Sequence, residues 1–479
     1  MNIPFIRLYN LCSGYYFYDI PKNVIIAVDS NTFCKLKELC KYGYENFEKQ
    51  YAGLNDDGYR TIQKLLKQGY LSNQQPETIY NPYTEYAEEY LNNCLNNLLI
   101  QVTQMCNFKC DYCPYSGNGL FDRMHNNKSM SFDTARKTID FFIDRCRYSQ
   151  ELTIGFYGGE PLLQFDLIKR IVEYTEKKAQ GKQVVFGITT NGYLIDNRII
   201  SFLKKHRFSL VISFDGPKHI HDKNRRLMTT GVGTYDCVYE NMRLLKENGI
   251  EFGINAVWDT EERFNEIIEF FKNDPLLYDI NVNVQQVLTG RIGTGYISDI
   301  ESEYQEEAFA VKAYLSYLGL YQQLSNEQND YVIQPYELIA KQIRERESMP
   351  TVFHHGGPCI PGYLRLFVDI NGVFYPCEKV SGKSTIMQIG SIDKGFDISK
   401  IKKLLNIGTL TESECKSCWA MNLCGICGMW ADNNGDCLCK KSKLSRCTFI
   451  KNIVNTNVMN YIVLSEIREL IKKDEKNAQ

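Results

Sequence analysis

Residues 98–113 read LLIQVTQMCNFKCDYC, an apolar run followed by three cysteines in a CxxxCxxC spacing. The run Leu98–Thr103 has the composition of a buried β-strand, so the cysteines fall just past its carboxyl end. Parallel α/β sheets place their active sites at that edge. Three thiolates on one tight loop can hold three irons of a [4Fe–4S] cube and leave the fourth iron open. Three structural cysteines, or part of a zinc site, are the alternative interpretations.

Short apolar runs alternate with amphipathic stretches such as Ser131–Arg147 as far as about residue 287. This pattern is typical of repeated βα units around a parallel sheet. It predicts an α/β fold with a partial (β/α)6 TIM-like barrel. A longer helix, Glu301–Leu324, is expected to lead out of the barrel. The predicted strands are Leu98–Thr103, Leu152–Tyr157, Val184–Thr190, Leu210–Phe214, Phe252–Val257 and Ile280–Gln286.

Three domains are predicted, at residues 1–92, 93–325 and 326–479. The first is expected to be a small α+β domain, because three apolar, aromatic-rich runs precede two helical stretches. Leu71–Thr84 has the composition of a linker, and a helix over about 450–473 is expected to close the chain. The runs are Phe5–Leu11, Tyr15–Ile20 and Val24–Val28, and the helices are Thr32–Lys41, capped by Asp29 or Ser30, and Tyr59–Gln68.

Charge and composition exclude several classes of protein. The chain of 479 residues carries 55 basic and 57 acidic residues, well mixed, for a net charge of −2. No basic footprint favours nucleic acid, and no stretch reaches the ~20 apolar residues needed to cross a bilayer. Without an apolar signal core near Met1, the chain is predicted to be cytoplasmic.

Cysteine usage points to metal chemistry. The chain has 18 cysteines, of which nine lie from Cys359 to Cys447, and only six histidines. Disulfides rarely persist in a reducing compartment, so metal binding or catalysis is the expected use. No histidine falls inside either cysteine cluster, which favours all-thiolate ligation of iron–sulfur clusters over Cys/His zinc sites.

The triplet Cys106, Cys110 and Cys113, with Tyr112 before the last cysteine, resembles the cluster loop of radical S-adenosylmethionine (SAM) enzymes. The resemblance implies that the open iron of a [4Fe–4S] cluster binds the amino and carboxylate groups of SAM. One electron then cleaves SAM to a 5′-deoxyadenosyl radical. Barrel strands of that family end in further cofactor-binding motifs.

Those motifs are matched in chain order by Gly158-Gly159-Glu160-Pro161, Thr189-Thr190-Asn191-Gly192 and Ser213-Phe214-Asp215-Gly216-Pro217. Gly158 and Gly159 would let the backbone approach a ligand, and Glu160 would receive its ammonium group. Polar groups predicted to contact the nucleoside are Asn191, Ser213, Asp215 and, near the adenine, Asn255. A ligand-free turn at Gly158–Pro161 and a satisfied buried amide at Asn255 are the alternatives. Arg225 and Arg226 are predicted to be solvated.

The later cysteines resemble the SPASM extension of radical SAM enzymes, which holds two auxiliary [4Fe–4S] clusters. The resemblance assigns three thiolates to the first cluster and four to the second, with Cys427 one residue early in the pattern. Cys437 or Cys439 could supply a fourth ligand to the first cluster, and a zinc ribbon is the alternative interpretation. The first set is Cys359, Cys377 and Cys427, and the second is Cys415, Cys418, Cys424 and Cys447. The other cysteines, expected to be buried small apolar residues, are Cys12, Cys34, Cys40, Cys94, Cys146 and Cys237.

Glu378 is the predicted catalytic base, because related sulfatase-maturating enzymes have an aspartate directly after the equivalent of Cys377. An exposed, solvated glutamate is the alternative, and the substitution argues against a sulfatase maturase. The amino-terminal domain resembles the winged-helix-like domain that recognises leader peptides, with a dimerisation module as the rival interpretation.

The stretches His354–Gly362 and Tyr375–Glu378 resemble maturases of cysteine-rich ribosomal peptides of the thioether-forming, ranthipeptide type. The implied reaction takes a hydrogen from a residue of the precursor peptide and joins a cysteine sulfur to that carbon. Expected partners are the cysteine-rich precursor peptide and a one-electron donor such as flavodoxin or ferredoxin. A sulfatase-maturating or carbon–carbon crosslinking enzyme, and a non-catalytic zinc-binding adaptor, are the alternative functions.

Overall fold

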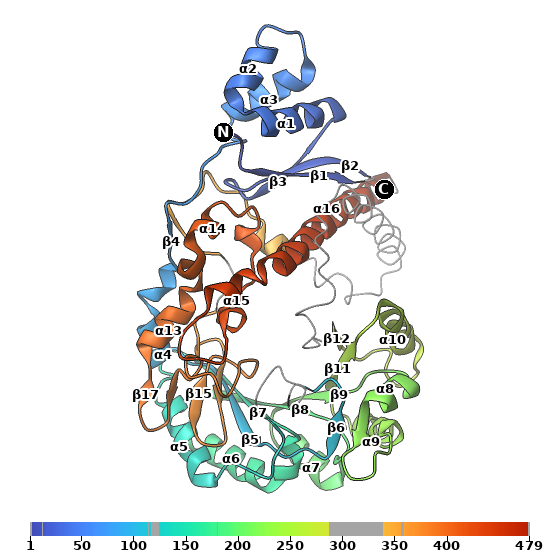
Figure 1. The fold of residues 1–479 in the computed structure, drawn as a ribbon. Coiled ribbons are helices and arrows are strands. Elements are labelled where there is room, and N and C mark those ends of the chain that lie inside the picture. Colours follow the sequence, from blue (N-terminus) through green and yellow to red (C-terminus); the bar gives the residue numbers. More distant parts are fainter. Residues whose placement is uncertain are drawn as a thin grey trace.

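The structure is a computed structural model that describes residues 2–11, 13–113, 115, 124–179, 181–286, 339–355 and 359–477. Figure 1 shows a small sheet with its helices at one end of the molecule and a larger sheet at the other. The cysteine-rich residues, orange to red, lie along one side between them. None of the helices in the described part of the chain is long and apolar enough to span a bilayer.

The six predicted barrel strands are confirmed. They are parallel neighbours in chain order, and their central residues, such as Ile100 and Ile154, are fully buried. A strand covered on both faces must be apolar on both, which is why these runs are continuous rather than alternating. The strands are β5 (Asn97–Thr103), β7 (Glu151–Gly158), β8 (Gln183–Thr190), β9 (Phe208–Ser213), β11 (Phe252–Trp258) and β12 (Val282–Gln286).

Helices cover the outer side of this sheet (Figure 1). The first begins after Ser131, whose hydroxyl accepts a hydrogen bond from the Thr134 N–H. Its residues Ala135, Ile139 and Phe142 are buried, as the apolar periodicity predicts. The covering helices are α5 (Phe132–Ile143), α6 (Phe165–Lys178), α7 (Asn197–Lys205), α8 (Lys218–Asn224), α9 (Tyr235–Glu247) and α10 (Glu261–Asn273).

The large sheet continues into the cysteine-rich region, which the sequence did not predict. β14 (Leu366–Val368) pairs in parallel with β5, Leu366 opposite Leu98. Three antiparallel strands follow and complete a 10-stranded sheet. The chain therefore returns to the first barrel strand just before Cys377. The added strands are β15 (Val373–Tyr375), β16 (Gly390–Ser391) and β17 (Gly395–Phe396).

The amino-terminal strands are confirmed and form one antiparallel sheet. Asp29 caps the first helix by accepting from the Thr32 N–H, and a further helix, α2, was not predicted. The sheet packs on helices with one face and on α16 with the other (Figure 1). The elements are β1 (Ile6–Leu11), β2 (Gly14–Asp19), β3 (Val24–Val28), α1 (Ser30–Tyr42), α2 (Tyr44–Tyr51), α3 (Asp57–Lys67) and the closing helix α16 (Cys447–Asn477).

The stretch predicted to be a linker is instead fixed to the carboxyl-terminal half. Leu71 is fully buried, and β4 (Thr78–Ile79) pairs in parallel with β13 (Val352–Phe353). Polar composition was misleading here, because the backbone of the stretch is hydrogen-bonded to a distant strand. The division into three domains stays a prediction, and the helix expected over Glu301–Leu324 lies outside the described residues.

Short elements complete the described chain. Two of these, β6 (Phe108–Cys110) and β10 (Arg225–Leu227), pair with each other beside the cysteine triplet. The others are α4 (Ala87–Asn93), α13 (Ile398–Leu405), α14 (Glu412–Lys416), α15 (Lys440–Leu444) and the single turns η1 (Pro82–Thr84), η2 (Pro161–Gln164), η3 (Ile407–Thr411), η4 (Met421–Leu423) and η5 (Gly428–Ala431).

Candidate functional site

The cysteine triplet follows β5 at the carboxyl edge of the parallel strands, as predicted. The loop is tight: the Cys113 N–H donates to the Cys110 carbonyl at 3.1 Å, and the Phe108 N–H donates to the Cys106 sulfur at 3.4 Å. Burial raises the pKa of both the Cys106 and the Cys110 thiol to about 12, and the neighbouring Cys113 thiol adds to each shift. Three thiolates gathered here would repel one another without a cation to hold them.

An iron–sulfur cluster with three protein ligands is the group that such a donor set fits, since thiolates are its ordinary ligands. When bound together with SAM, that cluster supplies the radical chemistry of the family. No set of three or more His, Cys, Asp or Glu side chains surrounds a single ion position among the described residues.

His125 was missed by the sequence interpretation, because it stands twelve residues past Cys113 and outside the motif. Its Nε2 lies 3.7 Å from the Cys113 sulfur. Its Nδ1 lies 3.2 Å from the Gln104 carbonyl, so Nδ1 carries the proton. The imidazole therefore connects the third cysteine to the end of β5.

Gly158 and Gly159 bring the end of β7 against this loop. A Cβ at Gly158 would lie 2.1 Å from the Thr103 carbonyl oxygen, and one at Gly159 would lie 2.0 Å from the Met105 carbonyl oxygen. A side chain at either position would push the cysteine loop away. Gly158 and Gly159 thus let two backbone segments approach each other closely. The approach of this backbone to a ligand stays a prediction.

Glu160 is buried and joins the ends of β7 and β8. Its Oε1 accepts from the Leu162 N–H at 3.0 Å and the Thr190 hydroxyl at 2.7 Å, and its Oε2 accepts from the Asn191 N–H at 2.7 Å. Burial raises the pKa of this carboxyl. An ammonium ligand would have to share oxygens that three protein donors already use, so binding SAM through Glu160 stays a prediction.

Asn191 links this junction to the cysteine loop. Its side-chain amide donates to the Asn107 side chain, one residue past Cys106, at 2.8 Å. Its amide oxygen accepts from the Tyr193 N–H at 3.1 Å. Asn191 therefore supports the loop from β8, and a contact with the nucleoside stays a prediction.

Asp215 and Arg225 form a buried ion pair, which corrects the prediction that Arg225 is solvated. Arg225 Nε and Nη2 donate to the two Asp215 oxygens at 2.9 and 3.1 Å. The Tyr112 hydroxyl donates to the same carboxylate at 2.6 Å, and Arg225 stands opposite Cys110 in the β6–β10 pair. Arg226, the neighbour, is exposed as predicted.

This arrangement makes Asp215 a brace for the cysteine loop. Its Oδ1 also accepts from the Val257 N–H at 3.2 Å, so protein donors use both carboxylate oxygens. A ribose contact, as predicted for Asp215, would compete with these donors. The aromatic ring of Tyr112 is held between the ion pair and the loop, with the Arg225 guanidinium 5.3 Å from the ring centre.

Ser213 and Asn255 stand side by side in register on β9 and β11, both half-buried. The Asn255 side-chain oxygen accepts from the Asn283 amide at 3.1 Å, across to β12. Asn255 is therefore not a buried amide satisfied by the backbone, because it is half-buried and its partner is a side chain. Its contact with adenine, and that of Ser213 with the ribose, stay predictions.

Cys359, Cys377 and Cys427 come together although 68 residues separate the first from the last. Burial raises the pKa of Cys377 to about 12, and the neighbouring Cys427 and Cys359 thiols add to the shift. Cys377 lies two residues past the end of β15, which pairs with the strand that joins β5. We call this set the three-thiol group.

Glu378 lies between the three-thiol group and the barrel. It is buried, which rules out the exposed glutamate, and its Oε1 accepts from Arg365 Nη1 at 2.6 Å. Its backbone carbonyl accepts from the Tyr115 hydroxyl at 3.1 Å, and Tyr115 is two residues past Cys113. Burial, then Tyr115 and Glu378, raise the pKa of Tyr157 on β7. A base role for Glu378 stays a prediction.

The other four predicted ligands also gather, beside α14 and the start of α16; we call them the four-thiol group. Burial raises the pKa of Cys424 to about 12, and the Cys418 and Cys415 thiols add to that shift. Cys415 and Cys418 likewise raise the pKa of Cys447 after burial does. Cys424 and Cys427, three residues apart, thus face different groups.

A lysine that the sequence interpretation overlooked completes this site. Lys443 on α15 is buried, and its Nζ lies 3.9 Å from the Cys415 sulfur. The Cys439 sulfur caps α15 by accepting from the Ser442 N–H at 3.4 Å, and its role as a fourth cluster ligand stays a prediction. Cys437 is exposed.

The remaining cysteines divide by burial. Cys146 is buried, as predicted, and Cys34 is exposed, which the sequence did not predict. Those that are half-buried are Cys40, Cys94 and Cys237. Cys12 lies outside the described residues.

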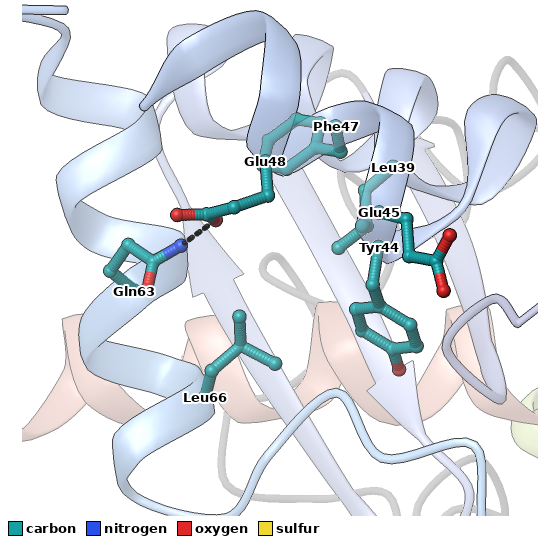
Figure 2. A pocket seen from close by; sticks show the side chains of 7 residues that line it. All are labelled: Leu39, Tyr44, Glu45, Phe47, Glu48, Gln63 and Leu66. Carbon is teal, nitrogen blue, oxygen red and sulfur yellow. Dashed lines mark hydrogen bonds between the residues drawn. The ribbon is translucent and has the colours of Figure 1, made fainter. Parts of the chain in front are cut away.

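A recess of about 300 Å³ lies in the amino-terminal helices, and no member of the cysteine triplet, the three-thiol group or the four-thiol group lines it (Figure 2). Leu39, Phe47 and Leu66 give it an apolar lining, and Glu48 accepts a hydrogen bond from Gln63 across it at 2.8 Å. Its apolar character differs from the polar, sulfur-rich surroundings of the barrel edge.

Residues 100–272 match the sequence model of the radical SAM superfamily, from β5 to α10. These residues therefore form a radical SAM domain, as the cysteine triplet and the barrel indicate.

Individual proteins that are similar to this chain share about a quarter of the aligned residues with it. A cysteine-type anaerobic sulfatase-maturating enzyme of Clostridium perfringens is 25% identical over 71% of this chain and 91% of its own length. The radical SAM cyclopropyl synthase TigE of Paramaledivibacter caminithermalis is 26% identical over 43% of this chain and 44% of its own length. The chain is matched over 44 to 58% of the lengths of the first three curated relatives.

The solved structure of anSMEcpe with bound AdoMet and Cp18Cys peptide has the same fold. The TM-score is 0.54 at 22% identity, covering 75% of this chain and 98% of that chain. This likeness confirms the predicted partial barrel.

Proposed function

We propose that this chain is a radical SAM peptide maturase that joins a cysteine sulfur to a carbon of a cysteine-rich ribosomal precursor peptide. The observation that carries the proposal is the placement of two incomplete thiol sets, Cys106/Cys110/Cys113 and the three-thiol group, on either side of Tyr115 and Glu378. Each set has three thiols where a cube has four irons, so each leaves an iron open. One open iron would serve SAM and the other a substrate sulfur.

Glu378 is well placed to take part in such a reaction. Closing a carbon–sulfur bond requires the substrate to lose a hydrogen atom from carbon, a proton from the thiol and one electron. A buried carboxylate one residue from Cys377 could accept that proton, and Arg365 would hold it in place. The electron would pass to the auxiliary sites, so the net change is a two-electron oxidation of the peptide.

The peptide substrate is supported from two sides. The solved relative is described as binding a peptide together with AdoMet. In addition, the amino-terminal strands and helices support the predicted leader-peptide domain, in which an extended peptide would add to an edge of the β1–β3 sheet. The precursor peptide and a flavodoxin- or ferredoxin-like electron donor are therefore the proposed partners.

A sulfatase-maturating function is the second candidate, because the Clostridium perfringens enzyme of that name is similar to this chain over 71% of its residues. Glu378 stands against it, as those enzymes are expected to have aspartate at that place. The carbon–carbon crosslinking alternative is kept as well, since TigE is named a cyclopropyl synthase.

The test is an anaerobic reaction of the reconstituted protein with SAM, a reductant and a synthetic cysteine-rich peptide. We expect 5′-deoxyadenosine and a peptide that has lost two hydrogens and one free thiol per crosslink, resistant to reducing agents. A matched peptide with every cysteine replaced by serine should not crosslink. A product that keeps all its thiols would overturn the thioether proposal in favour of the carbon–carbon alternative, and a sulfatase peptide converted instead would favour maturation.

Iron content tests the cluster assignment separately. Three cubes require about twelve irons per chain, falling by about four when Cys106, Cys110 and Cys113 are replaced by alanine. A colourless, zinc-loaded protein would point to the adaptor alternative.

A further inference from the structure

The amino group of Lys443 is buried beside the four-thiol group, and no carboxylate of the described residues forms an ion pair with it. Its Nζ donates to the Ile407 carbonyl at 2.7 Å and to the Thr411 hydroxyl at 2.7 Å, both uncharged acceptors. The side chain is 1% exposed. Burying an ammonium group is costly unless an anion lies near it.

The nearby anions are sulfur atoms. Burial lowers the pKa of Lys443, and negative charge on the Cys415, Cys424 and Cys447 sulfurs acts against that shift. Glu414 acts on it least and is already paired at the surface with Lys440 at 2.7 Å. The Thr411 hydroxyl bridges the pair, since it lies 3.2 Å from the Cys415 sulfur.

Two buried histidines, His354 and His355, lie near Lys443 and add no negative charge. The Gly408 N–H donates to His354 Nε2 at 2.8 Å, and His354 Nδ1 lies 2.9 Å from the His355 carbonyl, so the His354 ring is neutral. The His355 ring lies tilted against it, with 4.3 Å between the two ring centres. Lys443, His354 and His355 therefore contribute positive charge or no charge near the four-thiol group.

We propose that Lys443 sets the reduction potential of the group held by Cys415, Cys418, Cys424 and Cys447. The inference rests on the proposed function, which assigns an iron–sulfur cluster to those thiols. Reduction adds one electron, and hence one negative charge, to a centre that four thiolates already make negative. A fixed ammonium group at this distance stabilises the reduced form more than the oxidised form and therefore raises the potential.

The three-thiol group and the four-thiol group therefore lie in different electrostatic fields. Beside Cys377 the charges of Glu378 and Arg365 are paired, and Lys379, which acts on Cys427, is exposed, so water screens its charge. Beside Cys415 the Lys443 ammonium is buried and lies 3.9 Å from the sulfur. An electron released when the carbon–sulfur bond closes at the three-thiol group would then move downhill to the four-thiol group.

The test compares Lys443→Met and Lys443→Gln with Lys440→Met. Met removes both the charge and the hydrogen bonds, Gln keeps a donor without the charge, and Lys440 is a half-exposed lysine on the same helix. All are made in a Cys106/Cys110/Cys113→Ala background and titrated anaerobically with a dye-mediated reductant, followed by electron paramagnetic resonance. The signal of the four-thiol group is identified by its loss in Cys418→Ala.

Both Lys443 variants should lower the midpoint potential of that signal by at least a tenfold change in the reduction equilibrium, about 59 mV for one electron. The Lys440→Met potential should match the parent. Unchanged potentials in iron-replete Lys443→Met and Lys443→Gln would overturn the inference, as would loss of iron from both, which would make Lys443 a support of the loop alone. A parent protein without iron at these thiols would instead overturn the proposed function.

Discussion

The cysteine loop is braced by Arg225, and its removal is the most informative single change at the residue scale. Arg225→Met leaves the fully buried Asp215 carboxylate without its bidentate partner. Breaking a buried ion pair from one side costs about 3–5 kcal/mol, because the remaining charge is left uncompensated. We expect a lower urea midpoint by circular dichroism and weaker iron retention by the Cys106/Cys110/Cys113 loop.

Arg226→Met provides the matched control. Arg226 is the next residue in β10 but is exposed, so its loss should leave the urea midpoint and iron content close to the wild type. If Arg225→Met behaved like Arg226→Met, the ion pair would not be what holds the loop.

The sequence identified the thiols but not the charged residues around them. Cysteine spacing is a local signal, so Cys106, Cys110 and Cys113 could be recognised without a fold. Arg225 and Lys443 look like any surface cation in the sequence, and only packing reveals that they are buried. The partner of Arg225 is Asp215 and that of Lys443 is Thr411, and only the fold brings each pair together.

At the scale of elements, long strands could be predicted and short ones could not. The barrel strands β5 to β12 that make up the parallel sheet are long enough to show a continuous apolar run. β14 to β17 have only two or three residues each, so neither their existence nor their union with β5 had a signal. That union is what brings Cys377 to the mouth of the barrel.

The junction of β7 with the cysteine loop leads to a second prediction. Gly159→Ala would place a Cβ 2.0 Å from the Met105 carbonyl oxygen, so the loop must move. Overpacking against backbone costs at least about 1–3 kcal/mol. We expect about four irons fewer per chain, measured by iron and sulfide analysis, with the auxiliary signals retained.

Gly187→Ala on β8 is the control for adding one methyl group to the same sheet. The nearest atom to a Cβ there is the Gly155 Cα at 3.7 Å, an ordinary contact. Equal iron content in Gly159→Ala and Gly187→Ala would show that the close approach at Gly159 is not required to form the loop.

At the scale of the whole molecule, the amino-terminal sheet is built into the cysteine-rich region. Tyr9 and Tyr18 share a core with Leu423 and Ile426, and Cys415, Cys418 and Cys424 pack against that core. The Arg7 guanidinium lies 4.7 Å from the Trp419 ring centre, next to Cys418. A leader peptide bound to this sheet would therefore be held by a rigid part of the enzyme rather than by a tethered module.

Arg346 fastens this junction and supplies the third prediction. It donates to the Pro21 carbonyl at 2.7 Å, and to the Ile20 carbonyl and the Asn422 side chain at 3.0 Å. Because hydrogen bonds from a charged donor contribute about 1.5–3 kcal/mol, Arg346→Ala should loosen the docking of the first three strands. Hydrogen exchange should rise in β1 and β2 while β7 and β8 keep their protection.

Arg344→Ala separates this effect from a general weakening of the segment. The Arg344 side chain is exposed, and its structural contact is made by its backbone carbonyl, which accepts from Asn23 at 3.1 Å. That variant should exchange like the wild type. If hydrogen exchange in β1 and β2 were unchanged in Arg346→Ala as well, the shared apolar core alone would hold the sheet. Peptide binding to the sheet would then not depend on the hydrogen bonds of Arg346.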